Sequence, residues 1–360
     1  MKEKKMSDVQ RLKQDYPWIQ TPLVVGAPMR LIALADLAVE VSKAGGIGFI
    51  GAGTDTSSLS TYFQHAQRLL GASALATKNG TMPIGVGFIN WGADIDVAVS
   101  LIQKYRPAAV WFFAPSSTAS LMQWTEKSRE ACPETKVWVQ VGSVQEAMGA
   151  VRETKPDVLV VQGTDAGGHG LAQGAGLISL VPEVCDAVET YFSRDGGAGG
   201  ERPVIIAAGG IAEQRSAAAA MTLGASGVVL GTRLLASYEA NISKGYRDEV
   251  LRASDGGQTT VRTKVYDTLR NTNWAATHNA RGVINKTYFD AMDGMGEEEN
   301  RRLYTEETNK GDAGWGVENR MTTYAGSAVG LVKEVKGAGE IVREMRGQIG
   351  GVLDRAKAIL

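Results

Sequence analysis

Eight short apolar runs, rich in β-branched residues, recur along the first two thirds of the chain, and most of them end in a small residue. Continuous apolar runs of this length are typical of strands that are buried on both faces. Stretches with helical spacing separate them, and this alternation predicts βαβ units around a parallel sheet. The predicted strands are 23–29, 47–50, 84–90, 110–114, 137–142, 158–163, 204–209 and 228–231, and the predicted helices are 36–44, 58–70, 94–105, 143–153, 181–192 and 213–223.

The number of units favours one architecture within the α/β class. Eight units over about 220 residues match a (β/α)8 TIM barrel in count and size. A doubly wound open sheet is the alternative, but its first turn would carry a G-x-G-x-x-G phosphate loop. Gly26-Ala27-Pro28-Met29 stands there instead, so we favour the barrel. Asp94, Ser143 and Ser57 are expected to cap helices, with Glu146 completing a capping box after Ser143.

The pattern changes after Ala240. Residues 241–324 are polar, with few long apolar runs, but their aromatic residues argue against disorder. We predict a mainly helical insertion after the eighth strand, with helices near 262–270 and 297–305, lying over the barrel mouth as a substrate or lid subdomain. Residues 325–360 carry apolar residues at helical spacing and are expected to return to the barrel wall. The barrel would then comprise 1–240 together with 325–360, with an exposed loop tip at 195–200.

Composition excludes several classes of function. The chain is 44% hydrophobic and 21% charged, with a formal net charge of −1, so nothing suggests a nucleic-acid or anionic-membrane partner. Two cysteines are too few for a disulfide framework, and no spacing predicts a metal site. The first residues show no secretory pattern, and no apolar run reaches the ~18–20 residues of a membrane span. We therefore expect a cytoplasmic protein.

The sequence V-L-V-V-Q-G-T-D-A-G-G-H-G at 158–170 is the strongest functional signal. A buried strand ends at Gln162, and a glycine-rich turn then leads to His169. Barrels of this kind keep their chemistry at the carboxyl ends of their strands. Histidine is the side chain best suited to proton transfer near neutral pH. We therefore interpret His169 as a catalytic base, with an ordinary loop histidine as the alternative.

Two later turns predict an anion site. A-A-G-G-I at 207–211 follows the seventh predicted strand, and G-T-R at 231–233 follows the eighth. Loops at these positions often bind phosphate through backbone N–H groups, and a Thr232 hydroxyl could add a bond. The alternative is that these glycines only form tight turns.

Three strands end in amides, Asn90, Gln140 and Gln162. A buried amide needs hydrogen-bond partners, and these amides suit the pyrimidine edge and ribityl chain of a flavin. Any one of these amides alone could equally form hydrogen bonds with the backbone of a loop.

These segments resemble the nitronate monooxygenase family, formerly called 2-nitropropane dioxygenases, whose members are FMN-dependent (β/α)8 barrels. The similar motifs are G-A-P-M at 26–29, K-A-G-G-I-G at 43–48, Q-G-T-D-A-G-G-H at 162–169, A-A-G-G-I at 207–211 and G-T-R-L-L-A-S at 231–237. V-Y-D-T-L-R-N at 265–271 and R-G-V-I-N at 281–285 resemble the fungal-type members. The resemblance implies FMN as cofactor, bound by Ala27, Pro28, Met29, Asn90, Gln140, Gln162, Gly167, Gly168, Ala208, Gly209, Gly210, Gly231 and Thr232.

The resemblance also implies a reaction. His169 would remove an acidic α-proton, and the nitronate held against FMN would be oxidised by O2 to a carbonyl compound and nitrite. The partners would be a nitroalkane or nitronate and O2, and a homodimer is one option for the assembly. The alternatives are an NAD(P)H-dependent enoyl-thioester or quinone reductase of the same superfamily, a specialised flavin oxidase, or a non-catalytic phosphate-binding barrel. The last of these would have no use for the Gly167-Gly168-His169 sequence.

Overall fold

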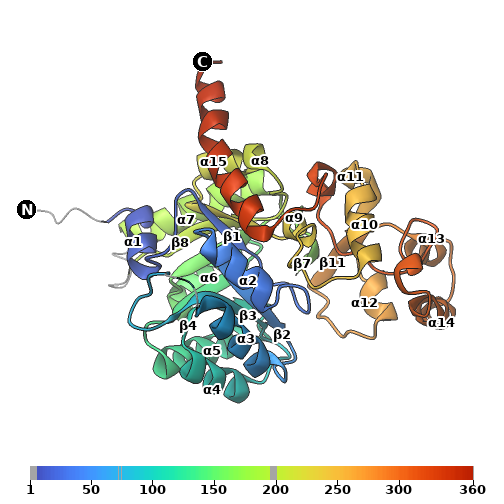
Figure 1. Ribbon diagram of the computed structural model, residues 1–360, viewed down its shortest axis with the longest axis horizontal. Coiled ribbons are helices and arrows are strands. Elements are labelled where there is room, and N and C mark those ends of the chain that lie inside the picture. Colours follow the sequence, from blue (N-terminus) through green and yellow to red (C-terminus); the bar gives the residue numbers. More distant parts are fainter. Residues whose placement is uncertain (1–5, 72, 74, 195–200, 360) are drawn as a thin grey trace, which may run out of the picture.

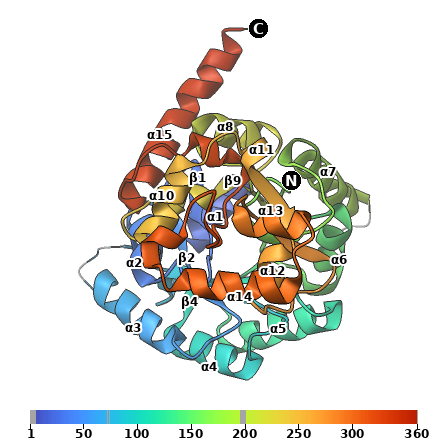
Figure 2. The ribbon, with the colours of Figure 1, turned by 90° about the vertical axis from the view of Figure 1, so that its right-hand side faces the viewer.

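The computed structural model describes residues 6–71, 73, 75–194 and 201–359. Eight parallel strands close into a barrel in the order β1-β2-β3-β4-β5-β6-β8-β9, which confirms the predicted (β/α)8 TIM barrel (Figures 1 and 2). The loop tip predicted at 195–200 lies outside the described residues. The barrel strands are β1 (Leu23–Gly26), β2 (Ile47–Gly53), β3 (Met82–Ile89), β4 (Pro107–Phe113), β5 (Lys136–Val141), β6 (Val158–Gln162), β8 (Val204–Ala208) and β9 (Gly227–Leu230).

An outer ring of helices covers the barrel, and buried aliphatic residues fill the layer between helices and strands (Figure 2). One member, α5, is not among the predicted helices. The long α15 is the predicted return of the chain to the barrel wall, and its first half packs against α2 and α8. The ring comprises α2 (Ala35–Lys43), α3 (Leu59–Leu70), α4 (Ile95–Tyr105), α5 (Thr118–Ala131), α6 (Val144–Thr154), α7 (Leu177–Arg194), α8 (Gln214–Thr222) and α15 (Ala338–Lys357).

The caps predicted for these helices hold in part. Asp94 accepts hydrogen bonds at the start of α4, and Ser143 accepts one from the Glu146 N–H at the start of α6. The capping box is wrong, because the Glu146 carboxylate instead accepts from the Gly142 N–H at 2.7 Å and so stabilises the strand end. The cap predicted at Ser57 is also wrong. Ser58 precedes α3, and its side chain makes no capping bond.

A separate aromatic cluster fills the barrel interior and closes its amino-terminal end. Trp111 and Trp138 stack with ring centroids 5.9 Å apart, and Phe49 packs edge-on against Trp111. The Trp138 indole donates to the Tyr16 hydroxyl at 2.7 Å. Tyr16 ends helix α1 (Asp8–Asp15), which lies at the end of the barrel opposite to residues 241–324 (Figure 1).

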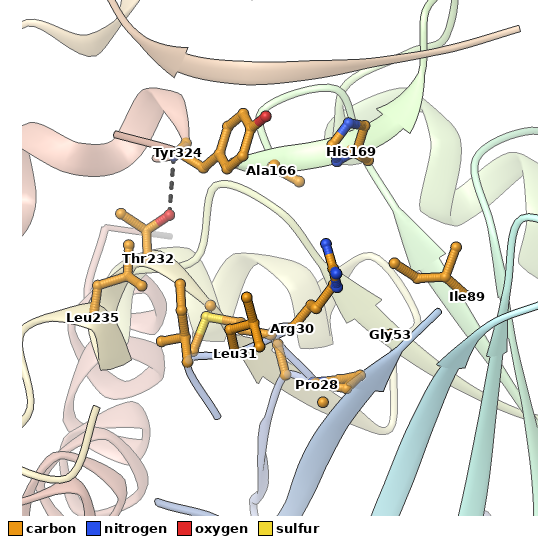
Figure 3. A pocket seen from close by; sticks show the side chains of 18 of the residues that line it. Pro28, Arg30, Leu31, Gly53, Ile89, Ala166, His169, Thr232, Leu235 and Tyr324 are labelled. Carbon is orange, nitrogen blue, oxygen red and sulfur yellow. Dashed lines mark hydrogen bonds between the residues drawn. The ribbon is translucent and has the colours of Figure 1, made fainter. Parts of the chain in front are cut away.

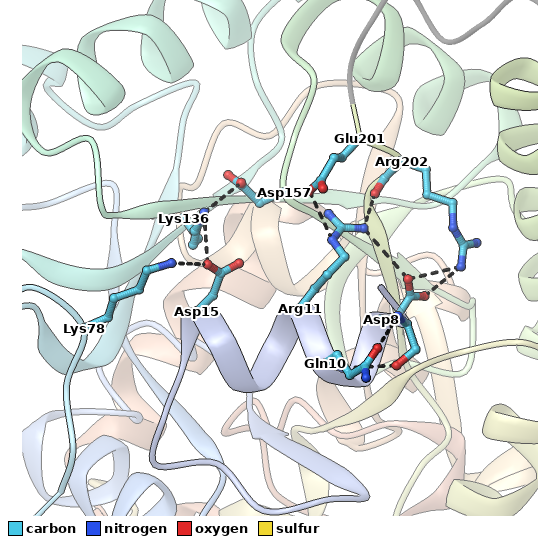
Figure 4. A network of polar contacts seen from close by, with 10 residues as sticks. Asp8, Gln10, Arg11, Asp15, Lys78, Lys136, Asp157, Glu201 and Arg202 are labelled. Carbon is cyan, nitrogen blue, oxygen red and sulfur yellow. Dashed lines mark hydrogen bonds and ion pairs between the residues drawn. The ribbon is translucent and has the colours of Figure 1, made fainter. Parts of the chain in front are cut away.

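Ion pairs hold α1 on the barrel. Asp15 accepts from Lys78 at 2.8 Å and from Lys136 at 3.2 Å, while Asp8 accepts from Arg202 at 3.1 Å (Figure 4). Arg11 also donates to the Arg202 carbonyl at 2.6 Å. In the described part of the chain this end is filled and covered, so we look for a ligand site at the carboxyl ends of the strands.

Residues 241–324 lie over those carboxyl ends (Figures 1 and 2). Helix α14 agrees with the helix predicted at 297–305. The helix predicted at 262–270 is wrong in its first part, because β10 occupies it and only α12 is helical. The elements are α10 (Lys244–Arg252), α11 (Gly256–Thr259), β10 (Thr260–Thr263), α12 (Val265–Leu269), β11 (His278–Val283), α13 (Lys286–Met292), α14 (Glu297–Thr308) and the 3-10 turn η2 (Gly311–Gly314).

One further strand joins this region to the barrel. The glycine-rich turn after β6 contains β7 (Gly168–Leu171), which pairs antiparallel with β11 in a three-stranded sheet of order β10-β11-β7. His169 stands opposite Ala280 in this pairing. The sequence predicts only a turn here, because a short G-H-G-L segment lacks strand periodicity and its partner is more than one hundred residues away. His169 is therefore fixed by a sheet and not by a free loop.

Candidate active site

A cavity of about 810 Å³ lies between the barrel mouth and residues 241–324 (Figure 3). Its volume is within the range typical of small-molecule and cofactor sites. The barrel side contributes the glycine turns after its strands together with large side chains such as Arg30, Trp91 and Phe113. Residues 241–324 contribute further large side chains. Those large side chains are Tyr246, Arg270, Trp274, Tyr304, Trp315 and Tyr324.

The structure brings nearly all of the predicted site residues together. His169 lines the cavity, and so do all of the predicted cofactor residues except Asn90: Ala27, Pro28, Met29, Gln140, Gln162, Gly167, Gly168, Ala208, Gly209, Gly210, Gly231 and Thr232. Asn90 is buried, and its Oδ1 accepts from the N–H of the lining residue Phe113 at 2.8 Å. Its Nδ2 is buried without a partner among the described residues. A buried amide donor of this kind calls for an acceptor.

The turns after β8 and β9 form a cluster of backbone donors. Gly209 and Gly210 have φ values of +100° and +71°, a conformation that glycine adopts without strain. Within the described part of the chain, no backbone acceptor outside regular helices and strands pairs with the N–H groups of Gly209, Gly210 or Thr232. The Thr232 Oγ1 accepts from the Gly326 N–H at 2.9 Å, so its own hydrogen stays available to donate (Figure 3). Unpaired donors in such turns suit an anionic group.

His169 makes three defined contacts with side chains from residues 241–324. Its Nε2 lies 2.7 Å from Oδ1 of Asp267. Its ring stacks on Trp274 with centroids 3.9 Å apart and planes 11° apart, and the Tyr324 ring packs against it edge-on at 5.5 Å. The His169 side chain is 16% exposed and that of Asp267 is 3% exposed. The histidine predicted from the barrel motif therefore has its partners in the polar segment that follows the barrel.

Asp267 is the site residue that the sequence does not identify. It stands in V-Y-D-T-L-R-N at 265–271, and the resemblance of this motif to fungal-type members implies no role for the aspartate. A single acidic residue in a five-residue helix has no spacing that links it to a histidine 98 positions earlier. The Thr272 hydroxyl at 3.3 Å and the Tyr324 hydroxyl at 3.4 Å also approach its Oδ1.

Two arginines from the β10-β11 hairpin hold the loop that carries the glycines. Arg262 donates to the Ala166 carbonyl at 3.0 Å, and Arg281 donates to the Thr164 carbonyl at 3.1 Å. Burial, followed by the neighbouring charge of Arg281, lowers the pKa of Arg262 to about 10. Burial also lowers the pKa of His278 to about 4, with smaller contributions from His169, Arg262 and Lys264. The two arginines therefore tie the β10-β11 pair to the glycine loop through backbone carbonyls.

Two absences apply to the described residues. No group of three or more histidine, cysteine, aspartate or glutamate side chains is placed there to hold a metal ion. No helix in that part of the chain is long and apolar enough to cross a membrane.

Comparison with known proteins agrees with the motifs. A family model described as nitronate monooxygenase matches residues 12–346. The chain is 48% identical to nitronate monooxygenase npaC of Metarhizium robertsii, over 98% of this chain and 95% of that one. It is 37% identical to a nitronate monooxygenase of Neurospora crassa, over 93% and 91% of the two chains.

A solved structure shares the fold. FabK from Thermotoga maritima superposes with a TM-score of 0.72 at 24% identity, covering 97% of this chain and 99% of that one. At that identity the likeness shows that the two chains share a fold, and nothing about their activities. The family match and the two relatives carry the assignment: the chain belongs to the nitronate monooxygenase family and is an oxidoreductase.

Proposed function

We propose that this enzyme binds FMN and uses O2 to oxidise alkyl nitronates and nitroalkanes to carbonyl compounds and nitrite, with His169 as the general base. The observation that carries the proposal is the position of His169. Its ring lines the same cavity as the unpaired N–H groups of Gly209 and Gly210. A base and an anion cradle in one cavity are what proton abstraction beside a phosphate-bearing cofactor requires.

The residues present fit FMN. The N–H groups of Gly209, Gly210 and Thr232 would hold its phosphate, and an added Cβ at Gly231 would have no neighbour closer than 3.9 Å, which leaves space there for a ligand. The main chain of residues 27–29 would lie beside the ring. The amides of Gln140 and Gln162, together with the unpartnered Nδ2 of Asn90, would contact the ring or ribityl chain. When bound, FMN supplies the electron transfer between the nitronate and O2.

The cavity also suits an anionic substrate beside a base. Arg30 and Arg270 line it, and Arg30 extends toward His169 in Figure 3. Their positive charges favour a nitronate over a neutral molecule. The aromatic rings of Trp274 and Tyr324 cover His169 and restrict access of water to the imidazole. We propose residues 241–324 as the substrate or lid subdomain on this basis. A cytoplasmic location and a homodimer stay predictions from the sequence.

Oxygen consumption tests the proposed function. Purified protein loaded with FMN is mixed with ethyl nitronate without any nicotinamide, and O2 uptake and nitrite release are recorded together. We expect uptake accompanied by nitrite. Uptake that begins only after NAD(P)H is added would contradict the proposal and favour a reductase.

The role of His169 has its own test. His169→Asn should lower kcat/KM for neutral nitroethane by about 10²-fold or more, because general-base catalysis contributes on that order. Ethyl nitronate has already lost its α-proton, so its turnover should change far less. Equal losses on the two substrates would exclude His169 as the base.

A further inference from the structure

We propose that Asp267 is a positioning residue that fixes the tautomer of His169, so that Nδ1 is the atom that accepts the substrate proton. The inference rests on the proposed role of His169 as a base and assigns the atom and the partner that this role needs. The proton leaves the α-carbon of the nitroalkane for Nδ1, and the electron pair of the broken C–H bond stays on the nitronate.

The hydrogen-bond geometry assigns the tautomer. A carboxylate can only accept, so the imidazole nitrogen 2.7 Å from Asp267 Oδ1 must donate. That nitrogen is Nε2, and a neutral ring with a proton on Nε2 carries its lone pair on Nδ1. Nδ1 of His169 has no hydrogen-bond partner in the described chain and is not among its buried unpaired atoms. Since His169 lines the cavity, Nδ1 is the ring nitrogen left for substrate.

Trp274 and Asp267 constrain the imidazole of His169 in different ways. Stacking on Trp274 fixes the plane of the imidazole. The Trp274 carbonyl in turn accepts from Lys264 at 3.0 Å, which holds that loop in place. A half-turn of the imidazole about the Cβ–Cγ bond keeps the same plane but puts Cε1 in the place of Nε2 and Cδ2 in the place of Nδ1. Among the contacts of the described residues, the bond from Nε2 to Asp267 distinguishes the two orientations, so the carboxylate keeps Nε2 on its own side and Nδ1 on the other.

Among the described residues, His169 forms the shortest hydrogen bond to the Asp267 carboxylate. The residue is 2% exposed, and its Oδ2 is buried without a partner in the described chain. No backbone N–H there donates to the Asp267 side chain, so it does not act as a helix cap. Thr272 and Tyr324 offer only long, neutral hydrogen bonds to Oδ1. When His169 takes up the proton, the positive charge arises beside this carboxylate, which stabilises it.

Asp267→Asn is the variant that tests the assignment. It keeps the shape of the side chain, but its amide can donate to Nε2 and so favour the tautomer with the proton on Nδ1. We expect kcat/KM for nitroethane to fall by about 10²-fold or more, while the value for ethyl nitronate changes by only about threefold. Asp293→Asn changes an exposed carboxylate of the same region and serves as the matched control.

A direct readout of the tautomer separates positioning from a structural role. Two-bond ¹⁵N–¹H spectra of ¹⁵N-histidine-labelled holoenzyme distinguish Nδ1–H from Nε2–H, and His169→Asn identifies the His169 signals. We expect Nε2–H in the wild type and a gain of Nδ1–H in Asp267→Asn. The wild-type spectrum tests the assignment even when the variant does not fold.

The outcomes can be told apart. Nδ1–H in the wild-type protein would overturn the inference, and so would an Asp267→Asn protein with unchanged tautomer and unchanged preference between the substrates. Both results leave the role of His169 intact. Equal loss on nitroethane and ethyl nitronate in His169→Asn would instead overturn the proposed function itself.

Discussion

The two sides of the cavity differ in the groups that they offer to a phosphate and to His169. The barrel side offers main-chain N–H groups and glycines, as at Gly209 and Gly210. The side formed by residues 241–324 offers chemically specific side chains, Asp267, Trp274 and Tyr324, around His169. A phosphate can be held by backbone donors alone, whereas proton transfer requires a positioned side chain. We infer that the barrel side determines cofactor binding and that the other side determines the chemistry of the base.

The most sensitive point should be the contact between the Gly167 turn and residues 325–326, where the chain leaves the 241–324 segment and returns to the barrel. A Cβ added at Gly167 would lie 2.5 Å from main-chain atoms of Ala325 and Gly326, which cannot move aside cheaply. Gly167→Ala should therefore cost about 3 kcal/mol of stability. It should also reduce turnover of nitroethane and ethyl nitronate together, since it displaces both sides.

Thermal unfolding measures that effect. Gly257→Ala serves as the control, because its added Cβ would meet nothing within 4 Å. If Gly167→Ala unfolds at the wild-type temperature, the contact between the Gly167 turn and residues 325–326 is not rigid.

The barrel side alone is probed at Gly231. The nearest atom to an added Cβ there is Ala27 Cβ at 3.9 Å, so the protein itself has room for Gly231→Ala. The methyl group would occupy space that we assign to FMN. We expect the FMN dissociation constant to rise about tenfold, which is about 1.4 kcal/mol, with the thermal midpoint of the apoprotein unchanged.

Fluorescence titration of apoprotein with FMN gives this constant. Gly149→Ala, on the outer helix α6, has no atom within 4 Å of its added Cβ and should bind FMN as the wild type does. An unchanged constant in Gly231→Ala would remove this turn from the cofactor site.

The side formed by residues 241–324 should show a pH-dependent effect on stability at His278. Burial lowers its pKa from 6.5 to about 4, so the unfolded chain binds a proton in this range that the folded chain does not. Stability must then fall as the pH decreases from 6.5 toward 4. The full difference corresponds to about 3 kcal/mol, and we expect about 1–2 kcal/mol because the ring is partly exposed.

His278→Gln removes the titrating group. The drop in thermal midpoint between pH 7 and pH 5 should be smaller in this variant than in the wild type. An equal drop in both proteins would show that His278 does not contribute to the acid sensitivity.

Local patterns predict the barrel well and the contacts of His169 poorly. The strands and glycine turns are short-range features, so apolar runs place Gly209, Gly210 and Gly231 at the mouth and bring His169 to the same end. The pairing of β7 with β11 and the bond from His169 to Asp267 join segments about 100 residues apart. No periodicity encodes such contacts, because they depend on how residues 241–324 pack.

Asn90 and Glu146 show that the sequence does not predict which hydrogen-bond partner a side chain takes. The ends of β3 and β5 are located correctly, but the direction of each side chain depends on competing partners. The Asn90 Oδ1 accepts from the Phe113 N–H on the neighbouring strand, and the Glu146 carboxylate accepts from the Gly142 N–H and not from the N–H at the start of the helix.

The FMN dissociation constant of Asp267→Asn, measured by fluorescence titration of the apoprotein, tests the division of labour most directly. The residue belongs to the chemical side and contacts His169, but none of the backbone donors assigned to the phosphate. We predict a constant within about twofold of the wild type, alongside the loss of nitroethane turnover described above. A tenfold weaker constant would show that residues 241–324 hold the cofactor as well, and would contradict the separation of cofactor binding from base chemistry.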